Sequence, residues 1–304
     1  MKIITYRTKI GNKAGILEGK KVLKIVPALK EYFLSAGSDE RPSDKVEELL
    51  AQGMLKPETL KALLNWLKSG GHEDKFTEKE EWVIAAPLMP GKIIALGRNY
   101  AAHAKEQNAP LPKEPIFFGK ASSSVIGAGE NVVYWDFIKK EDKNSRVDHE
   151  VELAVVIGKK AKQVKKKNAM DYVFGYAIIN DVTARSIQNL DFKLNQPWFR
   201  SKSIDTFCPL GPWIVTKDEI KNPHNLKLEC KVNGNVKQKG STQDFIFKLP
   251  EVIEYLTKYI TLMPGDVIST GTPDGISPVK PGDVMECFVE KIGTLVNKVI
   301  SEKR

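Results

Sequence analysis

The sequence predicts an α+β fold dominated by β-strands, in which a small α+β domain (residues 1–86) precedes a larger β-dominated domain (residues 87–304). Two observations support this. From about residue 87 the chain consists of short apolar runs broken by Gly, Pro and Asn, a texture typical of strands joined by turns. Before that point, strand-like runs precede two helical patterns, and the polar segment GHEDKFTEKEE (71–81) indicates a linker.

The N-terminal domain is expected to contain three short strands, at IITYR, AGILEG and KVLKIV (3–7, 14–19 and 21–26). A first helix is predicted at about 44–53, because Asp44 and Glu47 have the spacing of a capping box. A second helix is predicted to begin at Pro57, where proline suits the first helical turn, and to end at Gly70-Gly71. Leucines 60, 63, 64 and 67 have helical spacing between these limits.

Turn signals divide the larger domain into strands. Asn233-Gly234 is a typical two-residue hairpin turn, and MPGD, TPDG and KPGD mark further turns. A helix is predicted to open at Pro250 and to run to about Tyr259, with Val252, Ile253 and Leu256 on one stripe. The strands therefore outnumber the helices, which are expected to lie against the sheet.

Composition limits the partners and the compartment. The net charge is +9, and the densest basic cluster, KKAKQVKKK (159–167), has no aromatic residues or nucleic-acid-binding module beside it. We therefore expect a solvated surface and no nucleic-acid partner, although the surplus charge would attract anionic metabolites. No apolar run is long enough to span a membrane, and the N-terminus lacks a signal-peptide core. Cys208, Cys230 and Cys287 are far apart, which fits buried thiols in a reducing cytoplasm.

Two apolar runs carry carboxylates. VDHEVELAVVIG (147–158) is a strand pattern that places Glu150 and Glu152 on one face, about 7 Å apart. YVFGYAIIND ends at Asp181. Buried like charges need neutralisation, and three oxygen donors suit Mg²⁺ or Mn²⁺, with Ca²⁺ as a further option. Two alternatives stay open. The glutamates could lie on an exposed strand edge, and Asp181 could cap the helix that the following VTARSIQ predicts.

A helical pattern in KIIALGRNYAAHAKE (92–106) places His103 and Glu106 on one face, which Tyr100 shares. Glu106 would then orient His103 and raise its basicity, as a water-activating general base requires. The alternative is an ion pair on a solvated helix surface.

A further stretch, PWFRSKSIDTFCPLGPW (197–213), sets Arg200 and Lys202 among aromatic residues and prolines. Cations in such a setting often meet an anionic ligand or a carboxylate, and the alternative is a lysine that reaches into solvent. The segment TGTPDG (270–275), which contains Thr272, offers hydroxyl and backbone N–H donors or is only a turn.

Five of these stretches, in order, resemble the fumarylacetoacetate hydrolase family from about Pro87 to about Val299: GRNYAAHAKE, DHEVELAVVIGK, GYAIINDVTARSIQ, PWFRSKSIDTFCPLGPW and TGTPDGI. The resemblance implies a β-rich mixed-sheet fold, usually dimeric, and many bacterial members carry an N-terminal extension of about this size. It implies metal ligands at Glu150, Glu152 and Asp181, a His103–Glu106 dyad, and a catalytic Lys202. Substrate-binding residues implied nearby are Arg98, Tyr100, Lys120, Arg185, Gln188 and Thr272. The FFGK stretch departs from the family form, with Lys120-Ala121-Ser122 in place of Lys-Pro-Ser or Lys-Ser.

The resemblance also implies a small anionic 2-oxo acid or 1,3-dicarbonyl acid as substrate. Because His103 and Glu106 are both present, we predict a divalent-metal-dependent hydrolase that cleaves a C–C bond in an acylpyruvate or fumarylacetoacetate-type acid. The alternatives on the same metal–enolate site are a 2-hydroxyhepta-2,4-diene-1,7-dioate isomerase of aromatic catabolism and an oxaloacetate decarboxylase. An alternative of another class is a non-catalytic ligand-binding member. We expect a homodimer.

Overall fold

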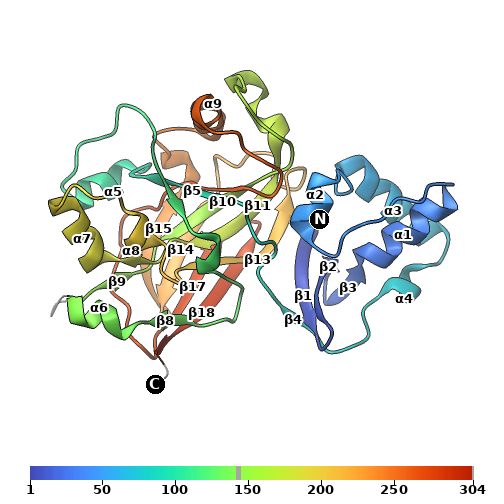
Figure 1. Cartoon of the computed structure of the whole chain (residues 1–304), viewed down its shortest axis with the longest axis horizontal. Coiled ribbons are helices and arrows are strands. Elements are labelled where there is room, and N and C mark those ends of the chain that lie inside the picture. The colour runs from blue at the N-terminus through green and yellow to red at the C-terminus, as the bar shows by residue number, and fades with distance from the viewer. Residues whose placement is uncertain (142–144, 303–304) are drawn as a thin grey trace.

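The computed structural model describes residues 1–141 and 145–302 (Figure 1). One large sheet runs through the molecule. Its strands, in spatial order, are β3 (Lys21–Lys24), β2 (Gly11–Glu18), β1 (Lys2–Thr8), β13 (Cys208–Thr216), β11 (Val173–Asn180), β10 (Val151–Ile157), β16 (Val267–Ser269), β5 (Ile93–Gly97) and β6 (Ile116–Lys120), with β4 (Val83–Ile84) beside β1 and β7 (Val125–Ile126) beside β13. The β16–β5 and β13–β7 pairs are parallel and the other pairs are antiparallel, so the sheet is mixed as predicted.

A second sheet packs against the large one. It consists of β15 (Asn235–Ser241), β14 (Lys227–Val232), β17 (Val284–Val289), β18 (Gly293–Ser301) and β8 (Val132–Tyr134), and a small separate pair joins β12 (Thr183–Ala184) to β9 (Val147–Asp148). Side chains of β10, such as Leu153, share one buried cluster with Leu228 of β14 and Cys287 of β17. The second sheet therefore lies behind the strand that carries the predicted carboxylates.

The helices of the larger part lie around the sheets (Figure 1). They are α5 (Ala101–Glu106), α6 (Asp136–Glu141), α7 (Arg185–Lys193), α8 (Phe199–Lys202) and α9 (Leu249–Tyr259), with 3₁₀ turns at Ser122–Ser124, Lys166–Tyr172 and Thr242–Asp244. In Figure 1, α5, α7 and α8 gather at the side of the molecule away from the N-terminus. The predicted helix at 250–259 is confirmed by α9, and the Asn233-Gly234 hairpin by the β14–β15 pair, where both turn residues have positive φ.

The N-terminal part contains β1 to β4 and the helices α1 (Ile25–Ser35), α2 (Val46–Ala51), α3 (Pro57–Ser69) and α4 (Glu73–Phe76). It is joined to the rest through the sheet, because β1 pairs with β13 with Ile3 opposite Ile214. One buried cluster includes Leu49 and Leu60 from the N-terminal helices together with Ile214 from β13. The sheet is therefore continuous across the expected domain boundary.

The structure corrects or confirms four local predictions in this part. The strand expected at 21–26 ends at Lys24, because α1 begins at Ile25. Asp44 is not a helix cap, since α2 begins at Val46 and its N-cap residue makes no side-chain cap bond. The helix predicted from Pro57 is confirmed by α3. The polar segment 71–81 contains α4, whose Phe76 is buried in the N-terminal core.

The structure also bears on the expectations about the lysine cluster, the cysteines and membrane-spanning helices. The lysines of the 159–167 cluster are exposed, and Lys166 forms an ion pair with Glu251. The three cysteines are buried and free of disulfides. Among the residues that the structure describes, no helix combines the length and apolarity needed to cross a bilayer.

Candidate active site

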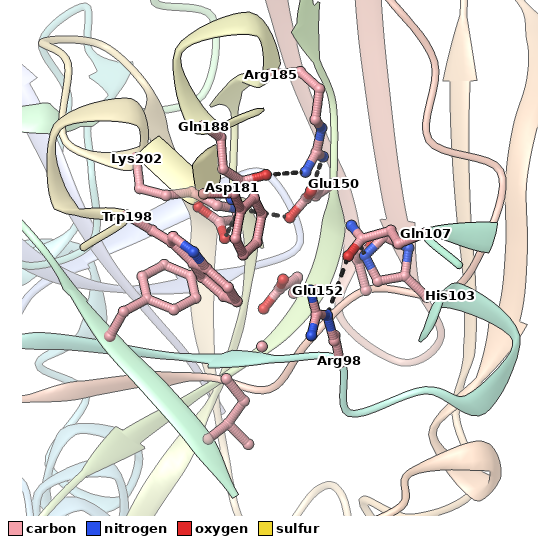
Figure 2. A pocket seen from close by; sticks show the side chains of 15 residues that line it. Arg98, His103, Gln107, Glu150, Glu152, Asp181, Arg185, Gln188, Trp198 and Lys202 are labelled. Carbon is pink, nitrogen blue, oxygen red and sulfur yellow. Dashed lines mark hydrogen bonds and ion pairs between the residues drawn. The ribbon is translucent and has the colours of Figure 1, made fainter. Parts of the chain in front are cut away.

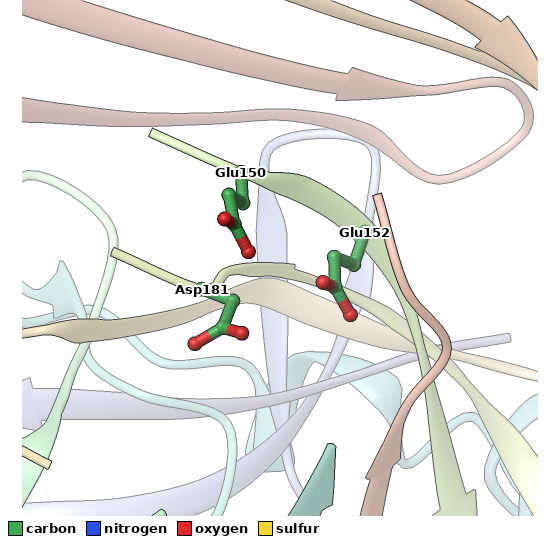
Figure 3. A group of neighbouring side chains, drawn as sticks. All are labelled: Glu150, Glu152 and Asp181. Carbon is green, nitrogen blue, oxygen red and sulfur yellow. The ribbon is translucent and has the colours of Figure 1, made fainter. Parts of the chain in front are cut away.

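The three predicted carboxylates meet at one end of β10 and β11, on the wall of a cavity (Figures 2 and 3). The antiparallel register explains this, because Val151 lies opposite Asn180 and the Asp181 N–H donates to the Glu150 carbonyl. Glu150, Glu152 and Asp181 each offer an oxygen, and these oxygens lie within 4.8 Å of one another. Each residue is at least 96% buried: exposures are 4%, 1% and 1%. The exposed-edge alternative for the glutamates is therefore wrong.

Buried cations neutralise two of these carboxylates. The Lys202 ammonium lies 2.8 Å from Glu150 Oε2 and 2.5 Å from Asp181 Oδ2. The Lys120 ammonium lies 2.7 Å from Asp181 Oδ1, and the Arg185 guanidinium forms an ion pair with Glu150. Asp181 therefore binds lysines and does not cap α7, whose N-cap position is Ala184 with no side-chain cap bond. Lys202 is thus a buried ion-pair partner, and the solvent-exposed alternative is wrong.

The electrostatic environments of the two glutamates differ. Burial opposes ionisation of Glu150, but Lys202 and Arg185 hold its pKa below the usual range. Burial raises the pKa of Glu152 well above its usual value, and repulsion from Asp181 and Glu150 adds to this. Glu152 accepts hydrogen bonds from Ser269 Oγ at 2.5 Å and from the Gly271 N–H at 2.7 Å. Glu152 is thus the member of the cluster without an ion-pair partner among the described residues, and its raised pKa favours the protonated form unless a cation binds beside it.

The predicted His103–Glu106 dyad exists on α5 and is partly enclosed. His103 Nδ1 lies 3.0 Å from Glu106 Oε2, and His103 Nε2 lies 3.0 Å from the side-chain nitrogen of Gln107. The Gly275 N–H donates to the other Glu106 oxygen at 3.0 Å. Burial opposes ionisation of Glu106, but the bonds from His103 and Gly275 lower its pKa. Because His103 is only 4% exposed, the alternative of a solvated surface pair is wrong for the histidine.

A small cavity brings most of the predicted residues together (Figure 2). Its walls are formed by Leu96, Gly97, Arg98, His103, Gln107, Phe118, Glu150, Glu152, Asp181, Arg185, Gln188, Phe192, Trp198, Lys202 and Thr272. Two predicted residues lie behind this wall and contact residues in it. Glu106 forms a hydrogen bond with His103, and Lys120 forms an ion pair with Asp181. Arg185 also contacts Gln188, and both come from the first turn of α7.

Tyr100 does not line the cavity, and its expected place near the substrate stays a prediction. Its ring is 2% exposed and packs edge-on against Phe245 at 5.2 Å between centroids. Burial raises the pKa of its hydroxyl, and that hydroxyl has no hydrogen-bond partner among the described residues. Tyr100 ends the extended segment just before α5, so its ring turns into the core and not along the dyad's face of the helix.

Reasoning from sequence missed six residues of the cavity wall: Leu96, Gly97, Gln107, Phe118, Phe192 and Trp198. A signal existed for two of them. Gln107 follows His103 by four residues, which is the helical neighbour spacing, and Trp198 belongs to the cationic, aromatic stretch already singled out. Trp198 lies so close to Gly97 that a Cβ there would be 2.8 Å from its ring.

Arg98 differs from the other cations of the cavity. Its backbone has a positive φ of 56°, a costly conformation for a residue with a side chain. Its guanidinium lies 5.6 Å from the centroid of the Phe192 ring and 5.8 Å from that of Trp198, and its Nε donates a long hydrogen bond of 3.4 Å to Gln107. Burial lowers its pKa. Within the described ranges it has no carboxylate partner, in contrast to Lys120, Lys202 and Arg185.

Comparison with known proteins identifies the family. Residues 92–300 match the family described as fumarylacetoacetate (FAA) hydrolase, C-terminal. This chain belongs to the fumarylacetoacetate hydrolase family. The family resemblance and the β-dominated fold predicted from the sequence are therefore confirmed.

Members with different reactions are similar to this chain. Human mitochondrial oxaloacetate tautomerase is 44% identical over 230 residues, which cover 73% of this chain and 71% of that protein. The 5-carboxymethyl-2-hydroxymuconate delta-isomerase of Mycobacterium smegmatis is 31% identical with a TM-score of 0.73, and 100% of each chain is covered. Maleylpyruvate hydrolase from Sphingobium sp. SYK-6, solved with manganese(II) and pyruvate, is 28% identical with a TM-score of 0.77 and the same coverage. The relatives thus include a tautomerase, an isomerase and a hydrolase.

Proposed function

We propose that this chain is a divalent-cation-dependent enzyme that interconverts the keto and enol forms of a four-carbon 2-oxo dicarboxylate such as oxaloacetate. Two lines of support lead to this choice over the hydrolysis expected from the sequence. The human relative named for this reaction is 44% identical. The cavity wall also combines buried carboxylates, a histidine and an arginine that has no carboxylate partner among the described residues, a set of groups that suits a small dianion bound with a cation.

The donor set fits a hard divalent cation. The oxygens of Glu150, Glu152 and Asp181 lie within 4.8 Å, about twice the metal–oxygen bond length of such ions. The Lys202 ammonium already bridges Glu150 and Asp181, so a positive charge is accommodated between them. Mg²⁺ or Mn²⁺ held there, with Ca²⁺ as a further option, would supply the charge that stabilises an enolate oxygen.

The observation that carries the choice of a dicarboxylate is Arg98. It is the cavity cation without a carboxylate partner in the described part of the chain, and it lies across the cavity from Asp181 (Figure 2). A half-buried guanidinium of this kind gains a charge-assisted, bidentate hydrogen bond when it meets a carboxylate. With one end of the substrate at the Glu150–Glu152–Asp181 cluster, Arg98 would bind the second carboxylate.

The proton transfer is assigned to His103. Tautomerisation breaks one C–H bond at carbon 3 and forms one O–H bond at the carbonyl oxygen of carbon 2, so the reaction needs a base that later returns a proton. Glu106 fixes the Nδ1 side of the ring, which leaves Nε2 to take the proton from carbon 3 and give it back at the oxygen. The bond between Gln107 and Nε2 holds this nitrogen in place until substrate enters.

C–C hydrolysis of an acylpyruvate is the second candidate, because the aromatic side of the cavity favours an apolar group. Phe118, Phe192 and Trp198 lie together, with ring centroids of Trp198 at 5.3 Å from Phe118 and 5.0 Å from Phe192. An acyl chain would pack there, and His103 would then take a proton from water. The isomerase and decarboxylase alternatives use the same enolate, and a homodimer remains our proposal for the assembly.

The test compares substrates. Ketonisation of enol-oxaloacetate and of enol-phenylpyruvate would be followed by the loss of ultraviolet absorbance, and cleavage of acetylpyruvate by product analysis, with Mn²⁺ added to chelator-treated protein. We expect a metal-dependent acceleration with oxaloacetate. Arg98→Met should lower kcat/KM for oxaloacetate by about 10- to 100-fold, the value of a charged hydrogen bond, and leave phenylpyruvate unaffected. Cleavage of acetylpyruvate without any acceleration of oxaloacetate ketonisation would favour the second candidate and refute the first.

A further inference from the structure

A buried amide lies behind the active site, on a strand that is otherwise exposed. Gln238 belongs to β15, where Asn235, Val236 and Lys237 are exposed, but Gln238 itself is fully buried. It does not line the cavity. A polar side chain that is buried within a solvated hairpin strand needs partners, and Gln238 has them in full.

Gln238 uses the whole hydrogen-bonding capacity of its amide. Its Oε1 accepts from the Val151 N–H at 3.1 Å and faces His149 Nδ1 at 2.9 Å. Its Nε2 donates to Thr272 Oγ1 and to the Pro273 carbonyl, both at 2.8 Å. Two acceptor sites and two donors are the maximum for this side chain. One end therefore holds the chain on either side of Glu150, and the other end holds the segment 272–273.

The segment 271–275 serves three parts of the active site. The Gly271 N–H donates to Glu152, Thr272 lines the cavity, and the Gly275 N–H donates to Glu106. Thr272 Oγ1 also donates to the Val151 carbonyl at 2.9 Å, so Gln238 and Thr272 together clamp both backbone groups of Val151. A shift of this segment would therefore displace the hydrogen-bond donors to Glu152 and to Glu106 at the same time.

The backbone of β15 supports the segment from behind. A Cβ on Gly275, whose φ is +94°, would lie 2.1 Å from the Lys237 carbonyl oxygen. A Cβ on Gly240 would lie 2.6 Å from Pro273. The segment therefore rests directly on β15, with Gln238 between these two contacts, and its position depends on that strand.

We propose that Gln238 is a positioning residue that sets the segment 271–275 against the carboxylate strand, and thereby couples the geometry of the metal ligands to that of the His103–Glu106 dyad. The inference rests on the proposed function, because it assumes a cation at Glu150, Glu152 and Asp181. Gln238 touches neither the cavity nor the ligand side chains and acts only through Val151, His149, Thr272 and Pro273.

The test measures Mn²⁺ binding to the full chain by calorimetry, which requires no turnover. Gln238→Met keeps the length of the side chain and removes all four hydrogen bonds. We expect its Kd for Mn²⁺ to rise by about 10- to 100-fold, the usual effect of losing the outer support of a metal site. Asn297→Leu is the matched control: Asn297 is a buried amide that donates to the Gly127 and Glu130 carbonyls at 2.8 Å, away from the cavity. It should lose stability and keep the Mn²⁺ affinity of the wild type.

A second variant covers the case in which Gln238→Met does not fold. Thr272→Val keeps the shape of the side chain and removes the hydroxyl that receives Gln238 Nε2, so its Kd should rise in the same direction. If both variants fold, their effects on kcat/KM should be less than additive, since they disrupt one connected clamp. Additive effects would indicate independent structural roles and overturn the proposal.

A failure of the positioning role and a failure of the proposed function give different results. Gln238→Met with the Mn²⁺ affinity of the wild type would overturn the positioning role and leave the proposed function intact. If Gln238→Met does not fold, an unchanged affinity in Thr272→Val would have the same meaning. A wild-type chain that binds no Mn²⁺ would overturn the metal site, and the positioning role with it.

Discussion

Replacing Lys202 with Met should make the stability of the folded chain depend on a divalent cation. The Lys202 ammonium is buried and contacts Glu150 at 2.8 Å and Asp181 at 2.5 Å. Removing one member of a buried ion pair costs about 3–5 kcal/mol, because the remaining charges stay buried without compensation. At about 2 °C per kcal/mol for a chain of this size, the melting temperature without metal should fall by about 6–10 °C.

Mn²⁺ should then restore more stability to the variant than to the wild type. The ammonium no longer competes for the same oxygens, so the Kd for Mn²⁺ should fall. The catalytic role that the family resemblance implies for Lys202 predicts that kcat/KM falls as well. A cation at 100 times its Kd adds about 2.7 kcal/mol to the free energy of unfolding. Thermal unfolding with chelator and with Mn²⁺ measures both effects.

The control for this experiment is Lys92→Met, since Lys92 pairs with the buried Asp266 at 2.5 Å but is itself half exposed and outside the cavity. Mn²⁺ should raise the melting temperature of Lys92→Met by as much as it raises that of the wild type. If Lys202→Met melts at the wild-type temperature in chelator, or if Mn²⁺ raises the two melting temperatures equally, then Lys202 does not neutralise these carboxylates and the reasoning is wrong.

Further predictions concern single groups. Glu152→Gln should weaken Mn²⁺ binding in a calorimetric titration without unfolding the chain, since the shape is kept and a repelling carboxylate is removed; tighter binding would contradict this. His103→Asn should slow oxaloacetate ketonisation by about 10²–10⁴-fold, the usual contribution of a positioned base, and Glu106→Gln should slow it less; equal rates in His103→Asn and wild type would remove the histidine from the mechanism. Phe76→Ala should lower the free energy of unfolding in urea by about 3–5 kcal/mol, because its ring is buried in the N-terminal core; a loss below 1 kcal/mol would show that segment 71–81 is only a linker.

Local patterns predicted the parts of the fold that depend on neighbouring residues. The placement of Glu150 and Glu152 on one face follows from the period of two along a strand, and α3 follows from Pro57 and its leucines. The same rules failed at α1, where Ile25 and Val26 continue a strand-like run although the chain turns into a helix. Burial in the N-terminal core, which also contains Leu49 and Leu60, outweighs the β-propensity of these branched residues.

Long-range pairing was beyond the reach of local patterns. Residue Asp181 reaches Glu150 only through the β10–β11 register, and β1 joins β13 across more than two hundred residues. Helical spacing indicated the His103–Glu106 dyad, and the family resemblance supplied the role of Lys202, but neither revealed that Lys202 bridges two carboxylates. Gln238 had no signal in the sequence at all, because it lies in a strand whose preceding residues are polar or exposed.

The charges of the site link the cation to the substrate. If all groups of this ion-pair cluster are ionised, the four carboxylates carry four negative charges and the four cations carry four positive ones; the members are Glu150, Glu152, Asp181 and Asp148, with Lys120, Lys202, Arg185 and Arg146. A divalent cation therefore adds two uncompensated positive charges to a buried cluster, and Arg98, which has no carboxylate partner in residues 1–141 and 145–302, adds a third nearby. A dianionic 2-oxo dicarboxylate cancels most of this excess. Each ligand should thus bind more tightly when the other is present, and the two affinities must rise by the same factor. A monoanionic acid would leave Arg98 unpaired, which is why the second carboxylate, and not the keto acid alone, is expected to decide which substrates this site accepts.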